Sequence, residues 1–224
     1  MRLTRFEDLF AVAAARKGGV EAFSDSMPEI LTPKALAAIA DDRWLATMTR
    51  CIFQAGFNWS VIANKWQGFE EAFEGFPVGR WSMMSDEDLD RLLKDTRVVR
   101  HAKKLISVGD NALFLRDLAQ EHGSGAAFFA HWPREDYVGL LQVLKKRGAR
   151  LGGNTGQYFL RFMGVDGFIT GGDVARALIR EGVVDKVPSS QRDMARVQEA
   201  FNHWTAESRL PMAHVSRTLA CTIE

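Results

Sequence analysis

Cysteine is scarce in this 224-residue chain. The two cysteines, Cys51 and Cys221, lie far apart, and neither belongs to a Cys-x-x-Cys motif. A disulfide framework requires several cysteines at close spacings, and a cysteine-rich zinc site requires paired ones. The glycine fingerprints of nucleotide-binding folds and a Ser-His-Asp arrangement are also missing. We therefore expect two free cysteines, no metal and no other cofactor.

Long apolar runs and an excess of charge are lacking as well. No stretch approaches the roughly 20 apolar residues that a membrane helix needs. The N-terminal segment carries Glu7 and Asp8 inside its apolar run, which is not typical of a secretion signal. The 29 basic and 28 acidic residues nearly cancel, so any nucleic-acid surface must be a local patch. We expect a soluble, cytoplasmic monomer without membrane contact.

Alternating β-branched runs are absent, whereas helical patterns cover most of the chain. Apolar residues recur at helical spacing in residues 6–16, 42–53, 59–66, 111–120 and 137–147. Caps predict further helices over residues 33–40, after Thr32, and 85–95, where Ser85 and Asp88 form a capping box; residues 70–73 read as a short helical piece. The pattern predicts an all-α fold, a two-lobed helical bundle. We expect a single unit over residues 1–224, with an N-terminal helical extension (about 1–40) and a C-terminal helical tail (185–224).

Residues 140–177 contain a glycine-rich hairpin between two helices. The first helix has a basic last turn, Lys145–Arg147, and ends at Gly148. The turn Leu-Gly-Gly-Asn, residues 151–154, follows, and the second helix begins at Thr155 and ends at Gly164. This order of elements predicts a helix-hairpin-helix motif.

Such a hairpin is suited to binding a DNA backbone. Glycines let the chain approach a phosphate closely, and amides at the start of the next helix point toward it. Basic side chains add attraction that does not depend on base sequence. We assign DNA contacts to Lys146, Gly152, Gly153, Asn154 and Thr155. The alternative is an ordinary helical turn capped by glycines, and the basic helix favours DNA.

Several motifs in this order resemble one family. QAGFNW, residues 54–59, is similar to Q-A-G-L-S-W of the 3-methyladenine DNA glycosylase I family; FEEAF and SDEDLDRLL follow at similar distances. VVRHAKKL, residues 98–105, resembles its I-[IV]-R-H-x-x-K-[IL], and LKKRGARLGGNTG resembles its L-K-K-R-G-F-K-F-V-G-T-T. The resemblance implies a DNA glycosylase of base-excision repair. Such an enzyme binds double-stranded DNA with a damaged base, flips out an alkylated, 3-methyladenine-like purine and hydrolyses its N-glycosidic bond.

The resemblance also implies roles for single residues. Trp59 would stack on the cationic base, with Phe53, Gln54 and Asn58 beside it. A cation over an indole face gains up to about 2 kcal/mol when desolvated. The alternative for Trp59 is a packing role, which we expect for Trp44, Trp66 and Trp81.

The basic motif at residues 98–105 allows two interpretations. His101, Lys103 and Lys104 either contact phosphates or line the pocket, and we assign them to DNA binding. The alternative is a solvated basic helix face.

The departures from the family concern chemistry. Cys51 stands where the family carries a glutamate that reads adenine, and a thiol is a poor acceptor. Aligning ITGGDVARAL with the superfamily's catalytic D-x-x-V-x-R helix puts Gly171 at the aspartate's place. Asp173 follows two residues later, and we interpret it as a helix N-cap. Cys51 and Asp173 are the two candidate catalytic residues.

The family's N-terminal tyrosines and its zinc site are missing too. Cys51, Cys221, His203 and His214 do not reproduce the zinc-ligand spacing. We expect no zinc, and the N-terminal extension and the C-terminal tail would brace the chain ends instead. The lesion therefore stays open, and the alternative function is a catalytically silent module that binds damaged or distorted DNA.

Overall fold

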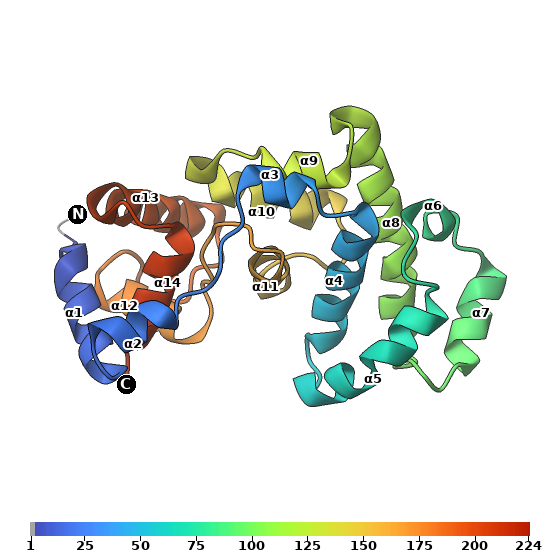
Figure 1. The fold of residues 1–224 in the computed structure, drawn as a ribbon, viewed down its shortest axis with the longest axis horizontal. Helices are drawn as coiled ribbons and strands as arrows, with labels where there is room; N and C mark the ends of the chain where they lie inside the picture. Colours follow the sequence, from blue (N-terminus) through green and yellow to red (C-terminus); the bar gives the residue numbers. More distant parts are fainter. Residues whose placement is uncertain (1–2) are drawn as a thin grey trace. The chain divides into compact units, whose positions relative to one another are not determined.

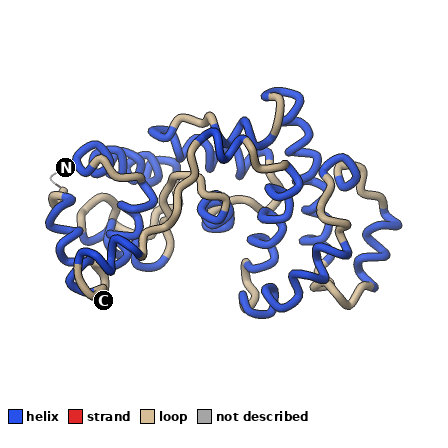
Figure 2. The backbone as a smooth tube through the Cα atoms, in the orientation of Figure 1, coloured by secondary structure: helices blue, strands red, loops and turns tan. Residues whose placement is uncertain are grey.

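The computed structural model describes residues 3–224, and these residues form helices and loops without any strand (Figure 2). The predicted all-α class is therefore confirmed. The chain divides into two compact units, and each is described by itself. Unit 1 comprises Met1–Leu31, Pro133–Leu140 and Gly164–Glu224, and unit 2 comprises Thr32–Trp132 and Leu141–Met163.

Unit 1 is built largely from the two ends of the described chain. Its helices are α1 (Phe6–Arg16), α2 (Val20–Asp25), the 3-10 turn η1 (Arg134–Asp136), α12 (Gly172–Arg180), α13 (Gln191–Ser208) and α14 (Met212–Cys221). Helix α10 (Tyr137–Arg147) begins in unit 1 and ends in unit 2.

The N-terminal extension and the C-terminal tail pack on each other. Helix α14 lies against both α1 and α12 (Figure 1). The indole N–H of Trp204 donates to the carbonyl of Thr4 at 2.9 Å, and the amide of Phe6 donates to Glu207 at 3.1 Å. The two segments thus hold each other by core packing and hydrogen bonds.

Unit 2 contains α3 (Pro33–Ala37), α4 (Asp41–Gln54), α5 (Trp59–Ala72), α6 (Val78–Trp81), α7 (Asp86–Lys94), α8 (Ala102–His122), α9 (Gly125–Ala130), the end of α10, and α11 (Asn154–Phe162). Helix α8 packs against α4, α6 and α9, and α4 also packs against α11 (Figure 1). The fully buried Trp44 of α4 stacks on Phe129 at 4.6 Å and meets Phe159 edge-on at 5.9 Å. These contacts hold the amino-terminal part of α4 against α9 and α11.

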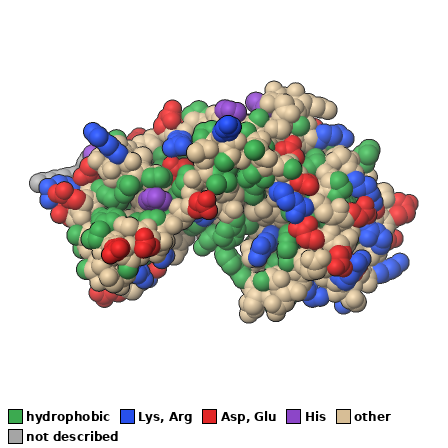
Figure 3. All heavy atoms as spheres, in the orientation of Figure 1, with side chains coloured by type: hydrophobic (Ala, Val, Ile, Leu, Met, Phe, Trp, Pro, Cys, Tyr) green, Lys and Arg blue, Asp and Glu red, His purple; other side chains and the backbone are tan. Residues whose placement is uncertain are grey.

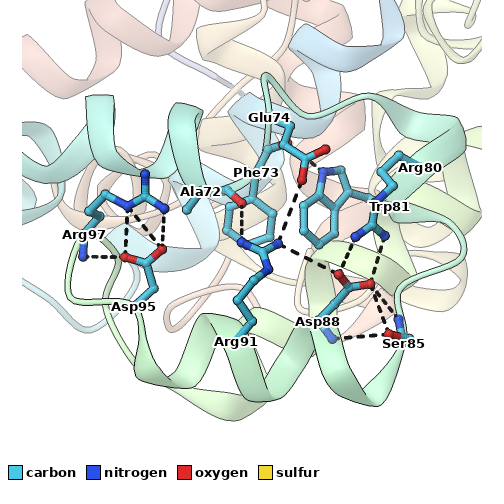
Figure 4. Close-up of polar contacts among 10 residues, drawn as sticks. All are labelled: Ala72, Phe73, Glu74, Arg80, Trp81, Ser85, Asp88, Arg91, Asp95 and Arg97. Carbon is cyan, nitrogen blue, oxygen red and sulfur yellow. Dashed lines mark hydrogen bonds and ion pairs between the residues drawn. The ribbon is translucent and has the colours of Figure 1, made fainter.

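A charged network closes the α6–α7 end of unit 2 (Figure 4). Asp88 forms the predicted capping box with Ser85 and an ion pair with Arg80. The Arg80 guanidinium lies 4.7 Å from the ring centroid of Trp81, whose N–H donates to the carbonyl of Phe73. The hydrogen bonds from Arg80 hold the pKa of Asp88 well below its usual range.

Some predicted helix boundaries were wrong. Residues 70–73 are not a separate helix, because α5 continues to Ala72 before the chain turns at Gly75. Helix α8 begins at Ala102, nine residues before the predicted start, because His101 is its N-cap. Asp173 is not an N-cap: Gly171 holds that position, and the Asp173 carboxylate pairs with Arg176 at 2.5 Å.

Candidate functional site

The α4–α5 turn projects exposed residues from unit 2. It joins Gln54, the last residue of α4, to Trp59, the first residue of α5. Gly56 has φ +76°, a conformation that side chains disfavour. Asn58 caps α5, because its side-chain oxygen accepts from the amide of Ser60 at 3.0 Å. Residues 55–60 are all exposed, so the turn is accessible to a large ligand.

Trp59 is an exposed aromatic platform. Its side chain is 45 % exposed, whereas Trp44 and Trp81 are fully buried, as expected for packing residues. Its ring meets Tyr158 at 5.4 Å and 86°, and Phe162 at 6.0 Å and 76°. These two α11 residues are not among the predicted site residues, although their i, i+4 spacing puts them on one helix face.

Trp66 packs differently from the other two structural tryptophans. It is half-buried, and its indole N–H donates to Glu70 at 3.1 Å. Its ring stacks on Phe69 and Phe76. Trp66 therefore has the packing role that the sequence indicated.

The residues just before the turn are buried. Gln54 is 6 % exposed, and within residues 3–224 its side-chain oxygen has no hydrogen-bond partner. Burial raises the pKa of the Cys51 thiol to about 12, so this group is neutral at ordinary pH. Phe53 is fully buried and lies edge-on against Phe69 at 4.8 Å. Of the predicted base-binding residues, Asn58 and Trp59 are accessible, Gln54 offers a buried acceptor, and Phe53 lies in the core.

Lys104 is buried behind the turn. It is 4 % exposed, and its Nζ donates to the carbonyls of Phe53 at 3.2 Å and Ala55 at 2.6 Å. Nζ also lies 4.4 Å from the ring centroid of Phe57. Burial, together with the nearby charge of Arg150, lowers the pKa of Lys104 to about 8. Of the two interpretations of this residue, its position agrees with lining a pocket.

A pocket of about 350 Å³ joins the turn to the hairpin. It is lined by Ile52, Ala55, Lys104, Arg150, Gly152 and Thr155. Two predicted hairpin residues and one predicted basic residue thus meet at one cavity within unit 2. Lys103 is exposed on α8; His101 is half-buried, and its buried Nδ1 has no partner within residues 3–224.

Hydrogen bonds from α8 hold the backbone of the hairpin between α10 and α11. Asn111 is buried on α8; its amide group donates to the carbonyl of Ala149 at 3.0 Å, and its oxygen accepts from the Ala149 amide at 2.9 Å. Gly153 is the N-cap of α11 with φ +59°. A Cβ at Gly156 would lie 2.3 Å from the carbonyl oxygen of Leu151, so the close approach needs glycine.

Basic side chains at the hairpin differ in their availability. Arg147 is committed to Glu121 through two bonds, at 2.6 and 2.8 Å. Lys145 and Lys146 are exposed, and in the part of the chain that the structure describes neither has an ion-pair partner. Elsewhere, charges of both signs are interspersed over the α5–α7 end of unit 2 (Figure 3). Lys145 and Lys146 therefore place exposed basic charge beside the hairpin.

Asp173 belongs to unit 1, whereas the site residues named above belong to unit 2. It lies in the first turn of α12, exposed and paired with Arg176. Between residues 3 and 224, no group of three or more His, Cys, Asp or Glu residues is arranged to hold a metal ion. No described helix is both long and apolar enough to span a bilayer.

Comparison with known proteins first defines the class. The 8-oxoguanine glycosylase/lyase of Methanocaldococcus jannaschii, solved with DNA, is similar over 95 % of both chains, with a TM-score of 0.59 and 16 % identity. The 3-methyladenine DNA glycosylase I of Staphylococcus aureus matches 69 % of this chain and 92 % of its own, with a TM-score of 0.50 and 25 % identity. The fold is that of the helical DNA glycosylases.

Part of the sequence also matches a known family. Residues 37–142 match the methyladenine glycosylase family. DNA-3-methyladenine glycosylase 1 of Escherichia coli (strain K12) is 25 % identical over an alignment of 120 residues, and the match covers 46 % of this chain and 64 % of that protein. This chain is therefore similar to the methyladenine glycosylase family over residues 37–142, and it spans less than two thirds of the length of that curated relative.

Proposed function

We propose that this protein is a DNA glycosylase of base-excision repair that removes an alkylated purine from double-stranded DNA. The observation that carries the proposal is the half-exposed Trp59, held against Tyr158 and Phe162 in the segment that matches the family.

The reaction needs little acid or base assistance. Alkylation at a ring nitrogen makes the purine cationic, and the bond between C1′ and the base then breaks with its electron pair passing to the base. The base leaves neutral, and water adds to the oxocarbenium-like sugar and releases a proton to the solvent. The protein must extrude the base, hold it over Trp59 and admit water. Extrusion costs a few kcal/mol, least for a damaged base. A neutral Cys51 is compatible with this chemistry, because no proton transfer through it is required.

The hairpin would hold the duplex during extrusion. Lys146, Gly152, Gly153, Asn154 and Thr155 stay our assignments for DNA contact, with Lys103 on α8. The exposed, unpaired Lys145 and Lys146 support that role, since counterion release by such side chains drives binding that is independent of sequence.

The decisive experiment is base release from methylated duplex DNA. Purified protein is incubated with duplex methylated by a simple alkylating agent, and free bases are separated by chromatography. We expect release of 3-methyladenine or a related purine, with no release from the unmethylated duplex. Tight binding to methylated duplex without any base release would contradict the proposal and support the catalytically silent module.

A further inference from the structure

Lys104 contacts the α4–α5 turn from behind, and no role in the proposed reaction accounts for it. We propose that Lys104 is a positioning residue, whose amino group clamps this turn and so fixes Gln54 and Trp59 for the base. The inference rests on the proposed function for its catalytic consequence, but the clamp itself can be tested without any activity.

The hydrogen bonds of Lys104 flank Gln54. Its Nζ donates to the carbonyl of Phe53, the residue before Gln54, and to that of Ala55, the residue after it. The last carbonyls of a helix have no partner within the helix, so these two acceptors need one from elsewhere. One nitrogen therefore holds the carbonyl of the residue before Gln54 and that of the residue after it.

A third contact reaches further along the turn. The Nζ of Lys104 lies 4.4 Å from the ring centroid of Phe57, close enough for a cation–π interaction. Asn58, the cap of α5, and Trp59, its first residue, follow directly. Lys104 thus contacts Phe53, Ala55 and Phe57. These three residues lead up to Asn58 and Trp59 in the chain.

A lysine at this place carries a desolvation cost. The side chain is buried, and Arg150, a group of the same sign, is the nearby charge that acts on it. Its hydrogen-bond acceptors are neutral carbonyls, and burial disfavours its charged form. A group that costs folding energy in a pocket is typical of a functional position.

The first test follows the orientation of Trp59. Protein labelled with 5-fluorotryptophan is studied by fluorine NMR, and the Trp59 resonance is assigned by its loss in Trp59→Phe. In Lys104→Met we expect that resonance to shift or broaden, while those of the buried Trp44 and Trp81 stay in place. Lys104→Arg, which keeps charged donors, should restore it. Lys94→Met removes the same charge from an exposed lysine of α7 and should leave the Trp59 resonance in place.

An unchanged Trp59 resonance in a folded Lys104→Met variant would overturn the clamp. If Lys104→Met does not fold, Lys104→Gln gives the same readout, because the glutamine side chain is uncharged and shorter than that of lysine. A shift of all tryptophan resonances together would also overturn the proposal, since it would indicate a general structural role.

The second test separates positioning from DNA binding. In single-turnover excision from methylated duplex, Lys104→Met should slow the reaction by about tenfold or more, since a small misplacement near reacting groups is costly. The Kd for DNA should change by less than about twofold, because a buried amine releases few counterions. A weaker Kd with an unchanged rate would make Lys104 a phosphate contact instead. If the wild-type protein releases no base, the proposed function fails, and the NMR experiment alone then decides the clamp.

Discussion

The ring of Trp59 stands perpendicular to the ring of Tyr158, with centroids 5.4 Å apart. The two residues come from different parts of unit 2. Trp59 is the first residue of α5 and lies within the segment that matches the family, whereas Tyr158 lies on α11, the helix that follows the hairpin in the chain. A perpendicular aromatic pair adds about 0.5–1.5 kcal/mol beyond simple burial. The platform is therefore held in one orientation by the helix that follows the predicted DNA-binding turn.

Replacing Trp59 separates function from folding. Trp59→Ala should abolish most excision of the alkylated base, while the melting temperature changes little, because nearly half of the side chain is already exposed. The matched control is Trp81→Ala, which empties a fully buried site and should cost about 3–5 kcal/mol of stability. Excision assays and thermal melts check both variants. A well-folded Trp59→Ala protein with undiminished excision would remove the stacking role.

Restoring a carboxylate at position 51 tests what distinguishes this chain from its relatives. Cys51→Glu should raise excision of 3-methyladenine and lower the melting temperature, because the carboxylate would be buried. Cys51→Gln is the matched control, with the same shape but no charge, and should give no gain. A stable Cys51→Glu variant that excises no faster would show that another residue sets the substrate preference.

Reversing one charge at the hairpin tests the DNA contact. Lys146→Glu should weaken binding to duplex DNA about equally for any base sequence and make the salt dependence less steep. Lys94→Glu, on α7 well away from α11 within unit 2 (Figure 1), is the control and should bind nearly as the wild type does. Fluorescence anisotropy over a range of salt concentrations measures both. Salt-independent binding, or equal losses in the two variants, would contradict the assignment.

The Arg80–Asp88 pair predicts how stability depends on pH. The folded-state pKa of Asp88 is depressed, so the pair stabilises the protein above the unfolded-state pKa of about 4, and this contribution is lost as the pH falls below that value. Asp88→Asn should lower the free energy of unfolding near pH 7 and flatten its decline below about pH 4. Asp90→Asn, an exposed change on the same helix, should do neither. Urea titrations from pH 7 to pH 3 check this, and identical slopes in wild type and Asp88→Asn would refute it.

The sequence predicted the fold best where apolar periodicity and caps agree. Helix α1 runs over Phe6–Arg16 as predicted, and Thr32 caps α3. The short helices α2, α6 and α9 carry too few residues for a period to be recognised. Asp173 was misread because an acidic residue in the first helical turn and an N-cap lie only two positions apart.

The site was predictable only in part. The motif match directed attention to Trp59, and its exposure agrees with a platform. The partners of Lys104 are backbone carbonyls, and these carry no side-chain pattern that a sequence can display. Asn111 likewise acts through the backbone of a residue 38 positions away. Contacts of this kind depend on tertiary packing and become visible only in the structure.

The two hydrogen bonds between Asn111 and Ala149 have a thermodynamic consequence. They restrict the hairpin before any ligand arrives, so the conformational entropy of this loop is lost during folding and not during association. In the proposed complex, affinity would then respond chiefly to ionic strength and only weakly to loop ordering. The unliganded hairpin would accordingly show slow amide hydrogen exchange at Ala149, like a buried helix rather than a free loop.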